Sequence, residues 1–298
     1  MTALGFIGAG AMGEPMARRL QQSGHDVLVW ARRPERAREL QEAGLGTGTL
    51  QEVLGRPVLV SCLLDTAAVR EVYLDGGPGS SALQAGLVIE HATIDPGVSR
   101  EVASSLAARG IHYVDAPVSG GPAGAADGTL VTMCGGTEEA LAAARPFLEA
   151  TCARIVPVGG PGSGVAIKLV NQLLVAAHSV AAAEAAALVR VLGIDPEVAL
   201  DALMGGWAAS RRLELQFTDG VRGQNAPDGA GLEKFLEVLD LVDEALDGAG
   251  ISSALMPGVR RTWEAAAATH PEDSFAALTE AYGHEPEGTP EGRGPGRG

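Results

Sequence analysis

Lysine is the residue that this sequence of 298 amino acids almost lacks. Its 22 basic residues are 20 arginines and two lysines, Lys168 and Lys234. Arginine therefore serves wherever the chain merely needs a positive charge. Lys168 stands in the apolar stretch GSGVAIKLVNQLLVA. A lysine kept there indicates a need for a group that can lose its proton, which a guanidinium cannot do.

Basic charge as a whole is also scarce. The formal net charge is -15 at pH 7, and the few arginine pairs are scattered along the chain. Such a balance repels the phosphates of nucleic acids and anionic lipids. We therefore expect no nucleic-acid partner and no membrane, and we expect a small molecule as the substrate.

Cysteine is rare as well, with three residues that show neither paired nor C-x-x-C spacing. This spacing argues against a disulfide framework or a metal site and favours buried, reduced thiols. The chain begins without a basic segment followed by an apolar run, and its alanine-rich stretch 173–192 is interrupted by His178, Glu184 and Arg190. We expect no export signal, no membrane span and a cytoplasmic protein.

Short β-rich runs alternate with helical runs from Leu4 to about Val158. The first of these strands are almost wholly apolar, which is typical of parallel strands covered by helices on both faces. After Val165 the pattern is helical throughout. We predict an α/β fold with a doubly wound sheet over 1–162 and an all-α domain over 163–284 that begins with a long connecting helix. The Gly-, Pro- and charge-rich end, 285–298, is expected to be a disordered tail.

A glycine motif marks the first strand-to-helix turn. GFIGAGAMG places Gly8, Gly10 and Gly13 in G-x-G-x-x-G spacing, with Ala11 and Met12 completing the loop. The first glycine permits a tight turn, the second lets backbone amides approach a pyrophosphate, and the third lets the helix pack closely. This context predicts a Rossmann dinucleotide-binding domain.

The second strand indicates which dinucleotide binds. NAD sites usually end this strand with an acidic residue, whereas here Ala31 is followed by Arg32 and Arg33. Guanidinium groups suit the 2′-phosphate of NADP. We predict that NADP(H) is preferred over NAD(H); the alternative is that both arginines merely begin a solvated helix.

Three stretches together resemble the β-hydroxyacid dehydrogenase family, which includes 3-hydroxyisobutyrate dehydrogenases, tartronate semialdehyde reductases and glyoxylate/succinic semialdehyde reductases. GFIGAGAMGEPMARRL is similar to the family's cofactor loop, DAPVSGGPAGAADGTL to its substrate-binding signature, and GSGVAIKLVNQLL to its catalytic helix. The resemblance covers most of the chain. It implies hydride transfer between NADP(H) and a small hydroxy acid, semialdehyde or keto acid, with the active site between the domains. It also implies a homodimer or homotetramer packed through the helical domain.

The resemblance implies that Lys168 is the catalytic lysine. It further implies that the substrate carboxylate is held by Ser119, Gly120 and Gly121, and that the nicotinamide end of the cofactor lies against Leu63, Leu64 and Thr93. The chemistry agrees, because hydride transfer to a carbonyl leaves an alkoxide that an ammonium can protonate. A hydroxyl beside two unhindered backbone amides can likewise bind an anion. The alternatives are a lysine that snorkels at a helix end and a plain turn at VSGG.

The catalytic helix departs from the family's K-x-x-N-N pattern. Asn171 and Gln172 stand where the family has two asparagines. Gln172 lies four residues after Lys168 and hence on the same helical face. We expect both amides to contribute to substrate binding, in a pocket slightly shifted by the longer glutamine.

A later helix departs further. The family commonly carries a Lys-Asp pair where this chain has Glu237 and Val238. Lys234 lies one turn earlier and could fill the vacancy near the cofactor, or it could be a surface residue. Ala230 stands where the family often has a pocket-lining aromatic, which predicts a substrate longer or bulkier than glyoxylate.

Two other functions stay open. In imine reductases, which share a related fold, another proton donor commonly replaces the lysine, so Lys168 argues against this class. A non-catalytic NADP(H)-binding protein would fit the altered C-terminal residues, but not the intact lysine and carboxylate signature.

Overall fold

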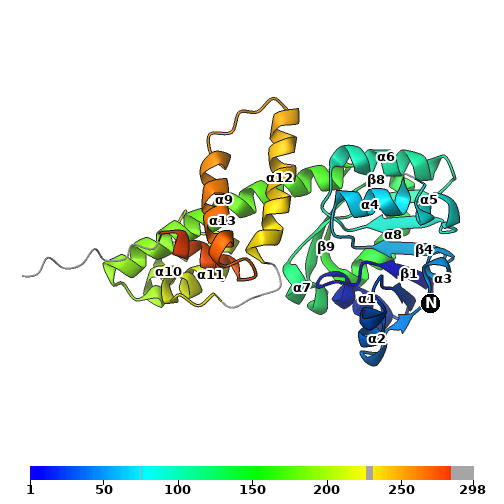
Figure 1. Cartoon of the computed structure of the whole chain (residues 1–298), viewed down its shortest axis with the longest axis horizontal. Coiled ribbons are helices and arrows are strands. Elements are labelled where there is room, and N and C mark those ends of the chain that lie inside the picture. Colours follow the sequence, from blue (N-terminus) through cyan, green and yellow to red (C-terminus); the bar gives the residue numbers. More distant parts are fainter. Residues whose placement is uncertain (75, 226–230, 283–298) are drawn as a thin grey trace, which may run out of the picture. The chain divides into compact units, whose positions relative to one another are not determined.

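The computed structural model describes residues 1–74, 76–225 and 231–282 (Figure 1). Its contacts divide the chain into two units. Unit 1 comprises Met1–Leu173 and Asp240–Ile251, and unit 2 comprises Leu174–Leu239 and Ser252–Gly298. The tail expected at 285–298 lies outside the described residues.

Unit 1 is built on a nine-stranded sheet with the order β3-β2-β1-β4-β5-β6-β8-β7, and β9 pairs with β8. Its strands are β1 (Ala3–Ile7), β2 (Asp26–Trp30), β3 (Gly46–Thr47), β4 (Val58–Ser61), β5 (Leu87–Glu90), β6 (His112–Asp115), β7 (Val118–Ser119), β8 (Leu130–Gly136) and β9 (Cys152–Gly159). The six neighbouring strands in the order β3-β2-β1-β4-β5-β6 all pair in parallel. Their order is that of the Rossmann fold, which confirms the predicted class.

The far end of the sheet differs from the parallel arrangement that the sequence predicts. Strand β8 runs antiparallel to both β6 and β7. Only the short helix α7 (Gly121–Asp127) and a turn at Gly128, with φ of +71°, separate β7 from β8. A parallel return requires a longer crossover connection. The short connection therefore reverses the strand.

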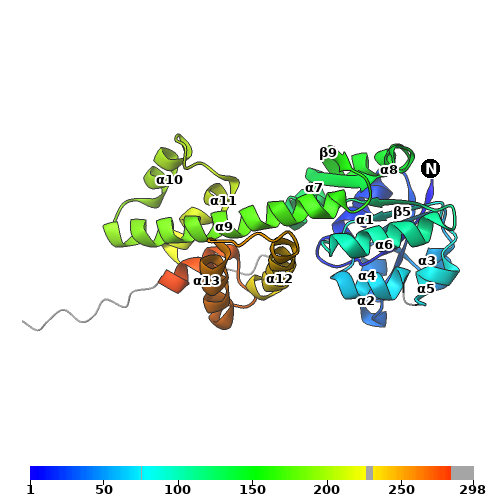
Figure 2. The same ribbon diagram turned by 90° about the horizontal axis from the view of Figure 1, so that it is seen from above.

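Helices cover both faces of this sheet. They are α1 (Gly13–Gln22), α2 (Pro34–Glu42), α3 (Leu50–Leu54), α4 (Thr66–Tyr73), α5 (Pro78–Ala82), α6 (Pro96–Ala107), α7 and α8 (Glu138–Thr151). Leu4 and Phe6 of β1 pack in one core with α1 and α8, whereas Ile7 packs in the other with α4 and α6. Figure 2 shows α8 on one side of the sheet and α4 and α6 on the other. The doubly wound prediction is confirmed.

The rest of the described chain is helical, as predicted. Its elements are α9 (Ser163–Leu192), α10 (Pro196–Met204), α11 (Arg211–Arg222), α12 (Leu232–Gly248), α13 (Met256–Thr269) and the 3₁₀ helix η1 (Phe275–Tyr282). In unit 2, α10 and α11 pack on one side of α9, with Ala186 of α9 in one cluster with Phe217 of α11 (Figure 2). Trp263 stacks against Phe235 with ring centroids 4.4 Å apart.

Helix α9 belongs to both units. We predicted a domain boundary between residues 162 and 163, whereas the contacts change between Leu173 and Leu174. The first turns of α9 pack with unit 1 because Val165 is buried in the sheet's core. By length and composition, α9 is also apolar enough to cross a membrane. Of its most apolar 18-residue window, 33% is buried, and Val165 and Ala186 of α9 pack in the cores of unit 1 and unit 2 respectively.

Candidate active site

The carboxyl ends of four neighbouring strands of unit 1 lie in one row. Ile7 of β1 pairs with Ser61 of β4, Ser61 with Glu90 of β5, and Glu90 with Asp115 of β6. Ligands of doubly wound sheets bind at this edge. The segments that follow these strands carry Gly8–Gly13, Leu63, Leu64, Thr93 and Ser119–Gly121. The register thus brings the predicted cofactor residues and the predicted carboxylate site to one edge.

The glycine loop has the geometry that a pyrophosphate needs. Gly8 has φ of +90°, and a Cβ atom there would collide with the carbonyl of Cys62. A Cβ atom on Gly13 would collide with the carbonyl of Gly8, whereas one on Gly10 would meet open space. No side chain caps the N-terminus of α1. The amide of Glu14 donates to the carbonyl oxygen of Gly10 at 3.0 Å and Pro15 has no N–H, so the backbone amides of Ala11, Met12 and Gly13 are the ones left for an anion. These residues fit a dinucleotide.

The two arginines predicted to bind the cofactor follow β2, at the same edge of the sheet as the glycine loop. Arg32 is exposed and donates a hydrogen bond of 3.0 Å to Glu71 of α4. Arg33 is also exposed and makes no ion pair with the described residues. Arg36, which the sequence analysis missed, donates to the carbonyl oxygen of Ala9 at 3.1 Å. It ties α2 to the glycine loop, a contact across 27 positions that no local pattern signals.

A buried carboxylate that the sequence analysis also missed holds the next two loops. Glu90 accepts hydrogen bonds from Ser61 Oγ at 2.5 Å and from the backbone amides of Ala92, at 2.8 Å, and Leu63. Burial raises the pKa of Glu90, and these hydrogen bonds oppose the rise. The carboxylate fastens the loops after β4 and β5. These loops carry the residues predicted to lie at the nicotinamide, of which Leu63 and Thr93 are half-buried and Leu64 is exposed.

The predicted carboxylate site lies between β7 and α7. Ser119 ends β7 opposite Val131 of β8. Gly120 and Gly121 have φ of +139° and +66°, values that favour glycine. Both glycines are exposed, and no side chain caps α7. The hydroxyl and the two adjacent amides are therefore open to a small anion, and the role predicted for them stays a prediction.

Lys168 lies in the second turn of α9, and only 7% of its surface is exposed. It has no hydrogen-bond or ion-pair partner among the residues that the structure describes. Burial lowers its pKa from the usual 10.5 to about 8. A lysine that snorkels would keep its charged end in water, which does not fit this burial. The group can therefore exist in both protonation states near neutral pH.

The two amides after Lys168 contact one another. Asn171 Nδ2 donates to Gln172 Oε1 at 3.0 Å. Gln172 is 8% exposed, whereas Asn171 is half-buried. Gln172 thus lies buried one turn beyond Lys168 with its oxygen engaged, which leaves its NH₂ group as the available donor.

The residues of the altered C-terminal motif lie on α12. Lys234 and Glu237 are exposed and Val238 is half-buried. Lys234 makes no ion pair with the described residues, and its proposed place near the cofactor stays a prediction. Ala230 lies outside the described residues.

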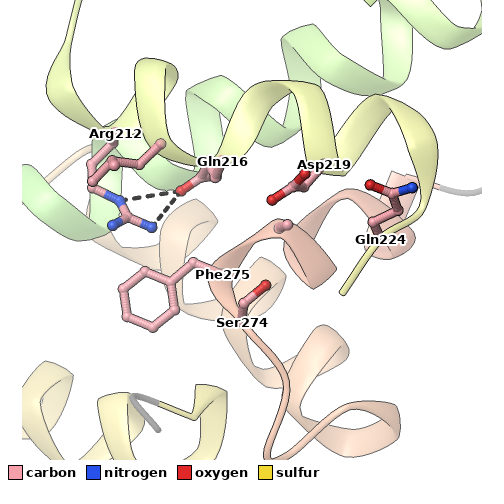
Figure 3. Close-up of a pocket in the computed structure, with 8 residues that line it drawn as sticks. Arg212, Gln216, Asp219, Gln224, Ser274 and Phe275 are labelled. Carbon is pink, nitrogen blue, oxygen red and sulfur yellow. Dashed lines mark hydrogen bonds between the residues drawn. The ribbon is translucent and has the colours of Figure 1, made fainter. Parts of the chain in front are cut away.

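A cavity of about 470 Å³ lies within unit 2, between α11 and the start of η1 (Figure 3). The Arg212 guanidinium lies 4.6 Å from the centre of the Phe275 ring and donates to Gln216 Oε1 at 2.7 Å. The lining residues are Arg212, Leu215, Gln216, Asp219, Gln224, Ser274, Phe275 and Ala276. None of the residues predicted to bind cofactor or substrate lines this cavity.

Comparison with known proteins agrees with this geometry. The family profile for the NAD binding domain of 6-phosphogluconate dehydrogenase matches residues 3–160. The profile for the NAD-binding domain of NADP-dependent 3-hydroxyisobutyrate dehydrogenase matches residues 162–282. The two profiles together cover both halves of the chain.

Named relatives carry related activities. The 3-hydroxyisobutyrate dehydrogenase of Pseudomonas aeruginosa is 39% identical over 216 residues, which are 70% of this chain and 72% of that protein. The 2-hydroxy-3-oxopropionate reductase of Escherichia coli is 36% identical over 214 residues, 71% of this chain and 73% of that protein.

Solved structures share the fold. The 3-hydroxyisobutyrate dehydrogenase of Mycobacterium tuberculosis, solved with L-serine, has a TM-score of 0.85 and 28% identity over 95% of this chain and 99% of that one. An imine reductase from Pseudomonas sp. has a TM-score of 0.62 and 20% identity over 95% of this chain and 99% of that one, a likeness of fold alone. The chain belongs to the β-hydroxyacid dehydrogenase family, which includes the 3-hydroxyisobutyrate dehydrogenases and whose members are NAD(P)-dependent oxidoreductases acting on CH–OH groups.

Proposed function

We propose that this protein interconverts a small β-hydroxy acid and its semialdehyde or keto acid with NADP(H), and that Lys168 moves the proton. The observation that carries the proposal is the burial of Lys168, which lowers its pKa to about 8. General acid–base catalysis is most effective when the pKa of the group lies near the working pH.

The proton balance of the reaction follows from this value. A dinucleotide held by the loop Gly8–Gly13 would supply the hydride for reduction of the carbonyl carbon and would accept it in oxidation. As the carbonyl oxygen becomes an alkoxide, the Lys168 ammonium donates a proton to it, which leaves a hydroxyl and a neutral amine. In oxidation, the neutral amine accepts the hydroxyl proton while the hydride leaves the carbon.

Substrate recognition rests on the segment Ser119–Gly121, which would hold the acid group. A neutral analogue leaves these donors unpaired, so a site built for the anion discriminates strongly against it. Ala230 stands where the family often has a pocket-lining aromatic residue, and this departure suggests room beyond the carbonyl. We propose a substrate chain longer or bulkier than that of glyoxylate.

We further propose a preference for NADP(H). Arg32 and Arg33 support it because both are exposed after β2, at the edge where the glycine loop lies. Guanidinium groups there can bind a 2′-phosphate by charge-assisted hydrogen bonds. The match to a profile named for an NADP-dependent enzyme is consistent with this preference.

We also propose a homodimer or homotetramer in the cytoplasm. The exposed apolar side chains of α9 support an interface between copies. These side chains are Ile167, Val170, Leu174, Leu188, Val191 and Leu192. Apolar side chains gathered on one exposed helix are typical of an interaction surface.

Turnover across small semialdehydes, keto acids, hydroxy acids and cyclic imines, each with NADP(H) and NAD(H), tests the proposal. We expect the highest kcat/KM with an aldehyde acid and NADPH, and a large loss with its methyl ester or amide. Efficient reduction of cyclic imines would assign the protein to the imine reductases. Tight NADPH binding without turnover of any of these compounds would indicate a non-catalytic role.

A further inference from the structure

Asp115 is a fully buried carboxylate that neither the sequence analysis nor the proposed reaction uses. It ends β6, in the row of strand ends that carries the candidate site, and none of its surface is exposed. A buried carboxylate is costly unless its oxygens receive hydrogen bonds. The partners of Asp115 therefore indicate what it stabilises.

Those partners lie at the start of α9. Oδ1 accepts the backbone amide of Gly162 at 2.8 Å, and Oδ2 accepts that of Val165 at 2.9 Å. The first amides of a helix have no partner within the helix, and a negative charge there interacts favourably with the helix dipole. Asp115 thus caps α9 from a strand 47 to 50 positions away in the sequence.

The backbones around this carboxylate approach so closely that the helix has little freedom to shift. A Cβ atom on Gly164 would lie 2.6 Å from the carbonyl oxygen of Asp115 and 2.5 Å from that of Met133. A Cβ atom on Gly135 would lie 2.5 Å from Asp115 Oδ1. Glycine at both positions lets β6, β8 and α9 meet at the carboxylate.

The proposed carboxylate site and the proposed proton donor both lie a few residues from this junction in the sequence. Ser119 follows Asp115 by four residues along the strand segment, and Lys168 follows Val165 by three residues, almost one helical turn. We propose that Asp115 is a positioning residue that fixes the Lys168 amine relative to the carboxylate site at Ser119–Gly121. This inference rests on the proposed function.

Asp115→Asn is the sharpest single change. An amide offers one oxygen acceptor and one NH₂ donor, so it can keep one of the two helix amides but must present a donor to the other. The first turn of α9 should then shift or fray. A misplacement of about 1 Å can lower a rate by about 10²-fold, because proton and hydride transfer need closely aligned groups.

Asp195→Asn is the matched control. Asp195 Oδ1 accepts the amides of Glu197 at 3.0 Å and Val198 at 3.1 Å at the start of α10. This aspartate also caps a helix through two backbone amides, but α10 carries no residue of the candidate site. We expect Asp115→Asn to lower kcat at least about tenfold, with the Kd for NADPH within about twofold. Asp195→Asn should leave both quantities nearly unchanged.

A second readout does not depend on turnover. Because the chain has only two lysines, labelling lysine with carbon-13 at Cε gives two side-chain NMR signals, and Lys234→Arg identifies them. We expect Asp115→Asn to move the Lys168 signal and raise its pKa from about 8 towards 10.5 as burial is lost. Asp195→Asn should not move it.

The outcomes separate this inference from the proposed function. If Asp115→Asn keeps the parent's kcat and Lys168 titration, Asp115 does not position the lysine. If the parent turns over no substrate, the proposed function fails, while the Lys168 titration still decides the role of Asp115. Should Asp115→Asn not fold, Asp115→Glu keeps both acceptors on a longer stem, and an unchanged kcat and Lys168 titration in that variant would overturn the inference.

Discussion

The two lysines of this chain stand in opposite environments. Lys168, near the start of α9, is 7% exposed, and burial lowers its pKa to about 8. Lys234, near the start of α12, is exposed to solvent. The same side chain is thus a buried group that can titrate near neutral pH in one place and a solvent-exposed group in the other. The comparison teaches that burial on an anchored helix, rather than residue type, creates the proposed acid.

Removing the amine of each lysine in turn should give the largest difference in kcat between two variants. We expect Lys168→Met to lower kcat by about 10²–10⁴-fold, because general acid catalysis contributes about that much. Binding of NADPH, measured by fluorescence titration, should change little. Lys234→Met is the comparison: it should keep kcat within about threefold if Lys234 is a surface residue, whereas a larger loss would support its predicted place near the cofactor. A Lys168→Met protein that stays within tenfold of the parent would break the comparison.

Arg32 and Arg33, which follow β2, are exposed like Lys234 but are expected to bind the cofactor. Replacing Arg32 and Arg33 together by alanine should raise the Kd for NADPH by about 10–100-fold, since hydrogen bonds to charged groups contribute about 1.5–3 kcal/mol. The Kd for NADH should change far less. Arg211→Ala, which removes an exposed ion-paired arginine of α11, serves as the control. Equal weakening of both cofactors would point to a fold defect instead.

The pH dependence of the two directions should mirror the titration of Lys168. Reduction needs the protonated amine, so kcat should fall about tenfold per pH unit above about 8. Oxidation needs the neutral amine, so kcat should rise with pH up to about 8 and then level off. The Lys234→Met protein should show the same profiles as the parent. Profiles with no inflection between pH 7 and 9 would contradict the assignment.

Stability should show the cost of keeping Lys168 buried. The folded pKa lies below the unfolded one, so the cost is absent above 10.5, grows as the pH falls, and is complete below about 8. It amounts to about 3 kcal/mol. Lys168→Met should therefore raise the free energy of unfolding at pH 7 by about 1–3 kcal/mol, and the gain should vanish above pH 10.5. Lys234→Met should change it by less than about 0.5 kcal/mol. Chemical denaturation at several pH values measures both.

The sequence predicted the features that depend on local patterns. Apolar runs such as LGFI and PVLVS gave the strands, and the spacing of Gly8, Gly10 and Gly13 gave the Rossmann turn. The resemblance supplied Lys168 and the segment Ser119–Gly121, which lie in the same unit as the glycine loop. The burial of Lys168 is consistent with the role that the scarcity of lysine had suggested.

The features that were missed arise from contacts between distant segments. In the sequence, Asp115 is one of many polar residues at strand ends, and only the fold brings the start of α9 against it. Glu90 likewise accepts hydrogen bonds from backbone amides of two different loops. The reversal of β8 depends on the short connection through α7, which the alternation of strands and helices does not encode. Local periodicity cannot show which backbone amides a buried carboxylate will meet.

The titration of Lys168 in the Lys234→Arg protein tests the central claim most directly. That protein keeps one lysine, so labelling lysine with carbon-13 at Cε gives a single side-chain signal that can be followed from pH 6 to 11. Burial on α9 predicts an inflection near pH 8, at the same pH as the inflection in kcat for reduction. A signal that titrates only near 10.5 would show a solvated ammonium and contradict the proposed proton donor.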